Sequence, residues 1–130
     1  MKKIAIIGAG NLGIAIAEGL IKNKAFLPEQ IIATRNNLQK IEHLKSQGVT
    51  ITSDNHFAVK EANYILLCVK PYKVTEVLEE LEADFTSSKI LISVATGISL
   101  KTYENILPKG ITIFRGMPNT AAAVEESITC

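Results

Sequence analysis

Three glycines near the start of the chain have the spacing of a phosphate-binding turn. Gly8, Gly10 and Gly13 form a G-x-G-x-x-G pattern that follows the apolar run 4–7 and opens the helix-like stretch 11–23. The first glycine permits a tight turn, the second lets the backbone approach a pyrophosphate, and the third allows close packing of helix on strand. Free N–H groups at the start of the helix would then point at the phosphates. The residues of this predicted site are Gly8, Ala9, Gly10, Asn11, Leu12 and Gly13.

The end of the second predicted strand indicates which dinucleotide would bind. Sheets that bind NAD usually carry Asp or Glu at this corner, because a carboxylate accepts hydrogen bonds from the adenosine ribose. This chain has Thr34, Arg35 and Asn36 there, with no acid, and the guanidinium of Arg35 suits a 2′-phosphate. We therefore predict NADP (as NADPH) as the cofactor, with NAD possible, and place these three residues on its adenosine side. The alternative is that Arg35 is an ordinary solvated loop residue.

No other residues form a set with an evident reaction. His43 and His56 have no partner at metal-ligand spacing, so we expect both to be solvated and predict no metal site. Glu125 and Glu126 are adjacent and would point in different directions on a helix, which favours a solvated face over a carboxylate pair. Cys68 lies inside an apolar run and is expected to be a small buried hydrophobe.

Length and charge bound the class of protein. The 130 residues are the length of one ordinary domain. The 14 Lys and Arg nearly balance the 13 Asp and Glu, which argues against nucleic acid or an anionic membrane as the main partner. No apolar run approaches the roughly eighteen residues of a membrane span, and Met1-Lys2-Lys3 leads directly into a strand, so we expect a cytoplasmic protein. The chain stops at Cys130 without a capping signal, which suggests truncation.

Strand-like and helix-like stretches alternate along the chain. Strands are expected over 3–7, 30–34, 49–51, 64–69, 89–94 and 111–114, and helices over 11–22, 37–47, 54–61, 99–106 and after Pro71. This alternation predicts an α/β fold, a doubly wound and mostly parallel Rossmann sheet in the order 3-2-1-4-5-6 with helices on both faces. Ligands should lie over the carboxyl ends of the strands. In the first helix we expect Asn11 as the cap and an inward face of Leu12, Ala15, Ile16, Gly19 and Leu20.

Four ordered segments give the chain a resemblance to a known enzyme family. The glycine loop is followed by Cys68-Val69-Lys70-Pro71, by the stretch 93–99 (SVATGIS) and by the stretch 115–120 (RGMPNT). Together these segments resemble pyrroline-5-carboxylate reductase, and the V-K-P and M-P-N-T segments are far more specific than the glycine loop. The resemblance implies an NAD(P)H-dependent reduction of a small cyclic imine, 1-pyrroline-5-carboxylate, to L-proline, the last step of proline biosynthesis.

The resemblance also implies which loops face the cofactor and the substrate. Asn55 would reach the adenosine side. The nicotinamide half of the cofactor site would be lined by Val69, Lys70 and Pro71 and bordered by Ala95, Thr96 and Gly97. The residues that would face the nicotinamide and the substrate are Lys70, Met117, Pro118, Asn119 and Thr120. By sequence pattern alone, Lys70 and Pro71 are equally well explained as a solvated strand end and a helix start.

The resemblance covers only the first domain of this family. After Thr120 the family continues with proline and a glycine-containing stretch, whereas this chain continues with AAAVEES over 121–127. The family's second, helical domain, which forms the homo-oligomer and much of the substrate site, is absent from the sequence. We therefore interpret residues 1–130 as an NADP-binding Rossmann domain that is inactive alone. A related NADP-dependent imine or ketone reductase and a non-catalytic dinucleotide-binding paralogue are the alternatives.

Overall fold

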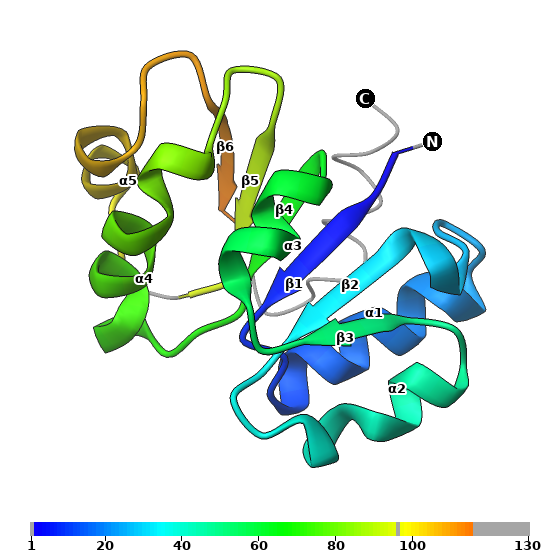
Figure 1. Cartoon of the computed structure of the whole chain (residues 1–130). Helices are drawn as coiled ribbons and strands as arrows, with labels where there is room; N and C mark the ends of the chain where they lie inside the picture. Colours follow the sequence, from blue (N-terminus) through cyan, green and yellow to red (C-terminus); the bar gives the residue numbers. More distant parts are fainter. Residues whose placement is uncertain (1, 96, 116–130) are drawn as a thin grey trace.

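Six parallel strands form one sheet in the computed structural model, which describes residues 2–95 and 97–115 (Figure 1). The strands are β1 (Ile4–Ile7), β2 (Ile31–Thr34), β3 (Thr50–Thr52), β4 (Tyr64–Leu67), β5 (Ile90–Ser93) and β6 (Thr112–Arg115). The helices are α1 (Asn11–Lys22), α2 (Glu42–Ser46), α3 (Asn55–Glu61), α4 (Val74–Leu81) and α5 (Leu100–Ile106). Short 3-10 turns lie at Pro28–Gln30, Leu38–Ile41, Pro71–Lys73 and Glu82–Asp84. Every predicted strand is present, with its ends moved by a residue or two.

The sheet has the order β3-β2-β1-β4-β5-β6, and every neighbouring pair is parallel. The predicted fold class and strand order are confirmed. The order reverses between β1 and β4, which pair from Ile4 with Tyr64 to Ile7 with Leu67. Because all six strands run the same way, the segments that follow them meet at one edge of the sheet, and the reversal opens a crevice there.

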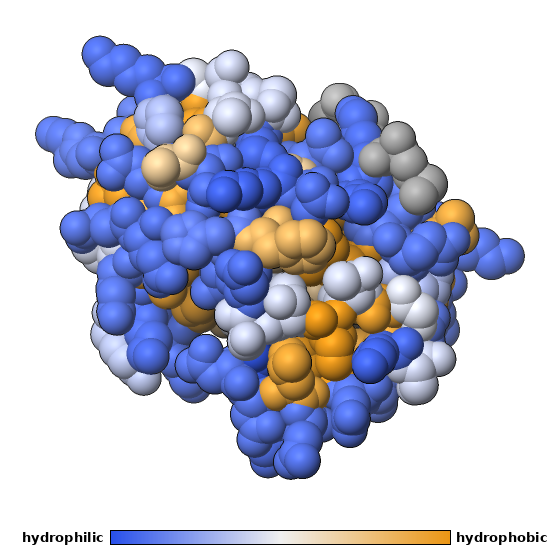
Figure 2. All heavy atoms as spheres, in the orientation of Figure 1, coloured by the Kyte–Doolittle hydropathy of each residue, from blue (hydrophilic) through white to orange (hydrophobic). Residues whose placement is uncertain are grey.

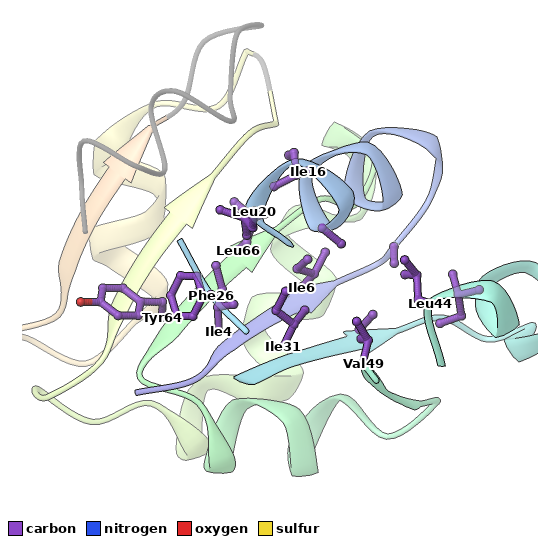
Figure 3. Packing of buried hydrophobic residues seen from close by; sticks show 14 of the residues in the cluster. Ile4, Ile6, Ile16, Leu20, Phe26, Ile31, Leu44, Val49, Tyr64 and Leu66 are labelled. Carbon is purple, nitrogen blue, oxygen red and sulfur yellow. The ribbon is translucent and has the colours of Figure 1, made fainter. Parts of the chain in front are cut away.

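Two apolar clusters, one on each face, hold helices against the sheet. Alternate residues of β1 divide between them: Ile4 and Ile6 pack with Ile16 and Leu20 of α1, as Figure 3 shows. Their neighbours Ala5 and Ile7 belong to the other cluster, which α3, α4 and α5 cover. A strand buried on both faces reads as an unbroken apolar run, which is why β1, β2 and β4 show no polar alternation. The prediction of helices on both faces is confirmed.

The first helix begins as predicted but presents a different face to the sheet. Its buried residues are Gly13, Ile16, Ala17 and Leu20. Leu12 is 44% exposed and Ala15 is also exposed, so their predicted inward positions are wrong. The buried positions Gly13, Ile16, Ala17 and Leu20 recur every three to four residues and define one side of the helix, and Leu12 and Ala15 lie off that side. The predicted Asn11 cap is also wrong: Gly10 occupies the cap position and makes no side-chain bond, and Asn11 lies inside the first turn.

The predicted helix over 37–47 is two shorter pieces. Asn37 caps the 3-10 turn Leu38–Ile41 by accepting a hydrogen bond from the Gln39 N–H, and α2 follows after a break in helical geometry at Ile41. Ile41 and Leu44 are both buried, because both pieces keep the same side on the sheet. Gly48 follows the segment at φ +107°, a backbone conformation that favours glycine after a helix.

The surface of the molecule is largely polar on the side shown in Figure 2. Hydrophilic side chains cover most of it, with apolar side chains visible between them over α3 and β3. Phe57 of α3 is 42% exposed. Of the helices in residues 2–95 and 97–115, none combines the length and the apolar character that crossing a membrane would require.

Candidate dinucleotide site at the carboxyl edge

A cleft of about 450 Å³ lies at the predicted crevice. It is lined by Gly8, Gly10, Thr34, Arg35, Asn36, Asn37, Ser53, Asn55, Cys68, Val69, Lys70, Lys73 and Val77. Eight of the residues predicted for the cofactor meet here, although they come from the ends of four different strands. A somewhat larger hollow of about 510 Å³ lies between α5 and β6, with Glu104 and Lys109 among its walls. It contains neither the glycine loop nor a long helix start, so its chemistry does not favour a phosphate.

The glycine loop is folded as the phosphate-binding pattern requires. Gly8 has a φ of +80°, and a Cβ built on it would lie 2.7 Å from Val69 Cγ1. A Cβ on Gly13 would lie 3.1 Å from Ile6 Cγ2, so this glycine allows α1 to sit close to β1. Nothing in the described residues lies nearer than 4.0 Å to a Cβ on Gly10, which leaves that side of the loop open for a ligand. The turn at Gly8 and the close packing at Gly13 agree with the roles expected from the sequence, and the open side of Gly10 would fit the approach of a pyrophosphate.

The hydrogen bonds of the loop identify the donors that are left for phosphate. The N–H of Gly8 donates to Thr34 Oγ1 at 3.1 Å, that of Ala9 to the Thr34 carbonyl at 2.7 Å, and that of Gly10 to the Gly8 carbonyl at 2.7 Å. Ile14 N–H makes the first helical bond, to the Gly10 carbonyl. Among the described residues, none accepts a hydrogen bond from the N–H groups of Asn11, Leu12 and Gly13.

These three free N–H groups lie at the start of a helix of twelve residues. The first turn of a helix leaves its N–H groups without internal partners, and the helix dipole adds partial positive charge at the same place. Both effects favour an anion. The pyrophosphate donors are therefore expected from the first turn of α1, while the loop before it supplies the turn.

Thr34 borders the cleft but is fully buried. Its hydroxyl accepts from Gly8 and lies 3.5 Å from the Ile6 carbonyl, to which it can donate. Its backbone carbonyl accepts a hydrogen bond from the Ala9 N–H. The side chain therefore braces the glycine loop from the neighbouring strand.

Arg35 connects the adenosine corner to the same loop. Its Nη1 donates to the Ala9 carbonyl at 3.1 Å, and its backbone N–H donates to the Thr52 carbonyl at 3.3 Å. The side chain is half-buried and lines the cleft with Asn36 and Asn55. One bond to Ala9 leaves further guanidinium N–H groups for an anionic ligand.

The cleft also has lining residues that the sequence analysis did not assign to the cofactor. They are Asn37, Ser53, Cys68, Lys73 and Val77. Ser53 directly follows β3, so its place after a strand was an available signal. Lys73 comes from the turn before α4 and joins Arg35 and Lys70 as a third cation on the cleft wall. Three cations suit a ligand with several phosphate charges.

The nicotinamide side of the predicted site is described in part. Val69 and Lys70 line the cleft, and Pro71 begins the 3-10 turn beside it. Ala95 and Gly97 lie after β5 and are outside the lining of this cleft. Thr96, Met117, Pro118, Asn119 and Thr120 fall outside the described residues, as do Glu125 and Glu126.

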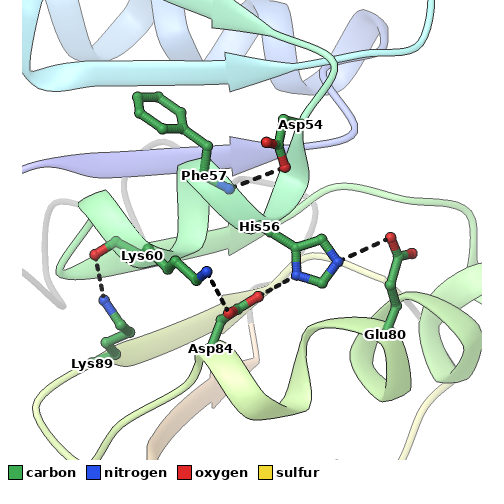
Figure 4. A network of polar contacts seen from close by, with 7 residues as sticks. All are labelled: Asp54, His56, Phe57, Lys60, Glu80, Asp84 and Lys89. Carbon is green, nitrogen blue, oxygen red and sulfur yellow. Dashed lines mark hydrogen bonds and ion pairs between the residues drawn. The ribbon is translucent and has the colours of Figure 1, made fainter.

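His56, which the sequence predicts to be solvated, has a half-exposed side chain that contacts two carboxylates. Figure 4 shows its ring between Asp84 and Glu80, with Nδ1 at 2.5 Å from the first carboxylate and Nε2 at 3.5 Å from the second. Lys60 approaches the same Asp84 at 3.7 Å, and Lys89 donates to the Lys60 carbonyl. The partners lie 24 and 28 positions away in sequence, so no local spacing could reveal them. In the described residues no group of three or more His, Cys, Asp or Glu could hold a metal.

Cys68 is a half-buried free thiol on the cleft wall. Burial raises its pKa from 9.0 to about 12. Since only the thiolate is a strong nucleophile, we expect iodoacetamide at pH 8 to alkylate Cys68 at least about a hundredfold more slowly than an unfolded thiol. The rate should climb as the pH rises towards 12. The measurement is mass spectrometry of a Cys130→Ser chain, with the urea-unfolded chain as control; equal rates in both states would contradict the burial.

The free energy of unfolding should depend on pH through the ionisation of the same thiol. The folded state holds the Cys68 proton more tightly than the unfolded state, so its contribution is fully present below pH 9 and is lost as the pH rises towards 12.

Comparison with known protein families identifies the class of protein to which the chain belongs. A family described as "NADP oxidoreductase coenzyme F420-dependent" matches residues 3–97. The chain belongs to this oxidoreductase family. The match runs from β1 to the segment after β5 and so includes the glycine loop and the Arg35 corner.

Relatives within this oxidoreductase class bear out the resemblance seen in the sequence. Pyrroline-5-carboxylate reductase 1 of Dictyostelium discoideum is 40% identical over 98% of the chain, which is 23% of that protein. Pyrroline-5-carboxylate reductase of Methanosarcina acetivorans is 39% identical over 97% of the chain and 47% of that protein. The chain thus spans 23% and 47% of the lengths of these two relatives.

Solved structures give the same result for the fold. A pyrroline-5-carboxylate reductase from Coxiella burnetii matches with a TM-score of 0.83 and 36% identity, over 95% of this chain and 46% of that one. The Plasmodium falciparum pyrroline carboxylate reductase, solved with NADP bound, matches with a TM-score of 0.79 and 25% identity, over 92% of this chain and 43% of that one. The resemblance to this reductase family is confirmed.

Proposed function

We propose that this chain is the NADPH-binding domain of a pyrroline-5-carboxylate reductase. The observation that carries the proposal is the cleft that unites the glycine loop, the Arg35 corner and the Val69-Lys70 segment. The 40% identity to a reductase of this name over almost the whole chain supports the substrate class. The reaction is the reduction of 1-pyrroline-5-carboxylate to L-proline.

The residues of the cleft fit the proposed cofactor. The three free N–H groups at the start of α1 suit a pyrophosphate, and the open side of Gly10 gives it access to the backbone. Arg35 offers charged donors to a 2′-phosphate, and among the described residues no carboxylate lines the cleft to compete for them. Asn55 and Lys73 complete the adenosine side. NADPH is therefore proposed over NADH.

The chemistry asks for positioning more than for acid catalysis. Bound NADPH would supply the hydride, and a protonated cyclic imine is already electrophilic. The chain's task is to hold the nicotinamide in contact with the imine carbon. For this end of the site we propose Val69, Lys70, Pro71, Ala95, Thr96 and Gly97, with Met117, Pro118, Asn119 and Thr120 towards the substrate.

The rest of the enzyme is proposed to lie in a second domain. The chain spans 44% and 47% of two of its reductase relatives, which leaves room for a domain of similar size. We propose that this helical domain completes the substrate site and forms the homo-oligomer, and that residues 1–130 are the NADP-binding domain. A cytoplasmic location stays a prediction.

A turnover experiment tests the proposed function. The 130-residue chain is expected to bind one NADPH but to oxidise it no faster with 1-pyrroline-5-carboxylate than without, whereas the longer gene product should oxidise it readily. NADPH absorbance follows both reactions. If the longer protein oxidises NADPH with other cyclic imines but not with 1-pyrroline-5-carboxylate, a related imine reductase would be favoured. Binding of NADPH without oxidation by any imine, in the longer protein, would favour a non-catalytic paralogue.

A further inference from the structure

A single polar side chain ends the apolar strand β5. The strand reads Ile90-Leu91-Ile92-Ser93, and Ser93 is fully buried. A buried hydroxyl without a partner costs about 1–3 kcal/mol, so serine is an unfavourable choice here unless its bonds are met. Leucine or valine would fill the same place without that cost, which indicates that the hydrogen bonds of the hydroxyl are needed here.

The hydroxyl of Ser93 has two partners. Tyr103 of α5 places its hydroxyl oxygen 2.5 Å from Ser93 Oγ, and the Ala95 N–H donates to the same Oγ at 3.3 Å. Tyr103 is fully buried, and burial raises its pKa against smaller opposing effects of the Ser93 bond and the Arg115 charge. The phenol therefore keeps its proton at neutral pH and can donate. The three groups link α5 to the backbone just after β5.

A second contact holds the same backbone from the neighbouring strand. Arg115 ends β6 and is the register partner of Ser93. Its Nη1 donates to the Ile98 carbonyl at 3.3 Å. The backbone of this segment is thus held by two hydrogen bonds, one from Ala95 to Ser93 and one from Arg115 to Ile98.

This segment lies beside the proposed nicotinamide end of the cleft. Val94 N–H donates to the Leu67 carbonyl, so the chain leaves β5 next to the end of β4. Ala95 and Ile98 pack against the same apolar cluster as Val69, which lines the cleft. A shift of the Ala95 backbone would therefore be expected to move the cleft wall at Val69.

We propose that Tyr103 and Ser93 are positioning residues that hold the backbone after β5 against the nicotinamide end of the cofactor. Neither would touch the cofactor; they act through Ala95. The inference rests on the proposed function, because that function assigns Ala95 and Gly97 to the nicotinamide border. In the proposed function α1 and Arg35 make the pyrophosphate and adenosine contacts, so the two hydroxyls should influence only one end of the ligand.

The test compares two ligands that differ only at that end. Calorimetry measures the binding of NADPH and of 2′-phospho-ADP-ribose, which lacks the nicotinamide, to the 130-residue chain. Tyr103→Phe keeps the ring and removes the hydroxyl. We expect it to weaken NADPH binding about fivefold, the size of one lost hydrogen bond, and to change 2′-phospho-ADP-ribose binding less than about twofold. Tyr64→Phe is the matched control, because Tyr64 is a buried tyrosine at the opposite, amino end of β4.

A second variant separates positioning from folding. Ser93→Ala should give the same NADPH-selective loss, and the double variant should lose no more than either single one, because both break one link. Additive losses, or equal weakening of both ligands, would show a general structural role and overturn the inference. Unchanged NADPH binding in both variants would overturn it as well. Failure of the unaltered chain to bind either ligand would instead overturn the proposed function, and the inference with it.

Discussion

Gly8→Ala is expected to raise the Kd of the chain for NADPH about thirtyfold, which is about 2 kcal/mol of binding free energy. The backbone of Gly8 has a φ of +80°, where an alanine is strained by about 1–3 kcal/mol. The new Cβ would also lie 2.7 Å from Val69 Cγ1, closer than carbon atoms can approach. The turn must move to relieve this contact, and the start of α1 moves with it. Fluorescence titration with NADPH gives the Kd, and thermal unfolding gives the stability.

Gly110→Ala is the matched control for backbone strain. Gly110 has a φ of +92° but lies before β6, and a Cβ there would meet only Ser87 at an ordinary 3.5 Å. This variant should lose stability while it binds NADPH normally. Adding Val69→Ala to Gly8→Ala should restore part of the affinity, because it removes the atom that clashes. Normal NADPH binding by Gly8→Ala itself would show that the glycine loop is not the phosphate site.

Arg35→Ala is expected to weaken NADPH binding about fiftyfold and NADH binding only a few-fold. Hydrogen bonds to charged groups contribute about 1.5–3 kcal/mol, and only NADPH carries the 2′-phosphate that would receive them. The small loss for NADH follows from the bond between Arg35 Nη1 and the Ala9 carbonyl, which steadies the loop for either cofactor. Paired titrations with the two cofactors measure the change in selectivity.

Lys22→Ala is the control for net charge. Lys22 is exposed in the last turn of α1, away from the cleft, so its removal lowers the charge equally without touching the site. Equal effects of Lys22→Ala and Arg35→Ala on the Kd for NADPH would reduce the role of Arg35 to bulk electrostatics. Similar losses for NADPH and NADH in Arg35→Ala would contradict a 2′-phosphate contact.

The sheet was predictable because its signals are local. Unbroken apolar runs mark strands buried on both faces, and glycine or proline marks their ends, so the order of β1 to β6 follows from chain connectivity. The rotation of α1 was not predictable in this way. Leu12 is as apolar as Leu20, and only the tertiary fold leaves Leu12 exposed while it buries Leu20.

The site was predictable where a residue directly follows a strand. Arg35, which lines the cleft, follows this rule, whereas Asn55 was assigned through the resemblance to the reductase family. Thr34 was predicted for the adenosine side, yet its hydroxyl accepts a hydrogen bond from Gly8, 26 positions away, and no sequence pattern distinguishes that contact from one to a ligand. The same limit applies to His56 and to Tyr103, whose partners are brought near only by the tertiary fold.

One measurement tests the central claim most directly, that the carboxyl-edge cleft binds NADPH. A titration of the ¹⁵N-labelled chain followed by amide chemical shifts reports every site at once. We expect the largest changes at Asn11, Leu12 and Gly13, with further changes at Arg35 and Asn55. The hollow between α5 and β6 should stay unperturbed. Changes centred on that hollow, or none at millimolar NADPH, would contradict the claim.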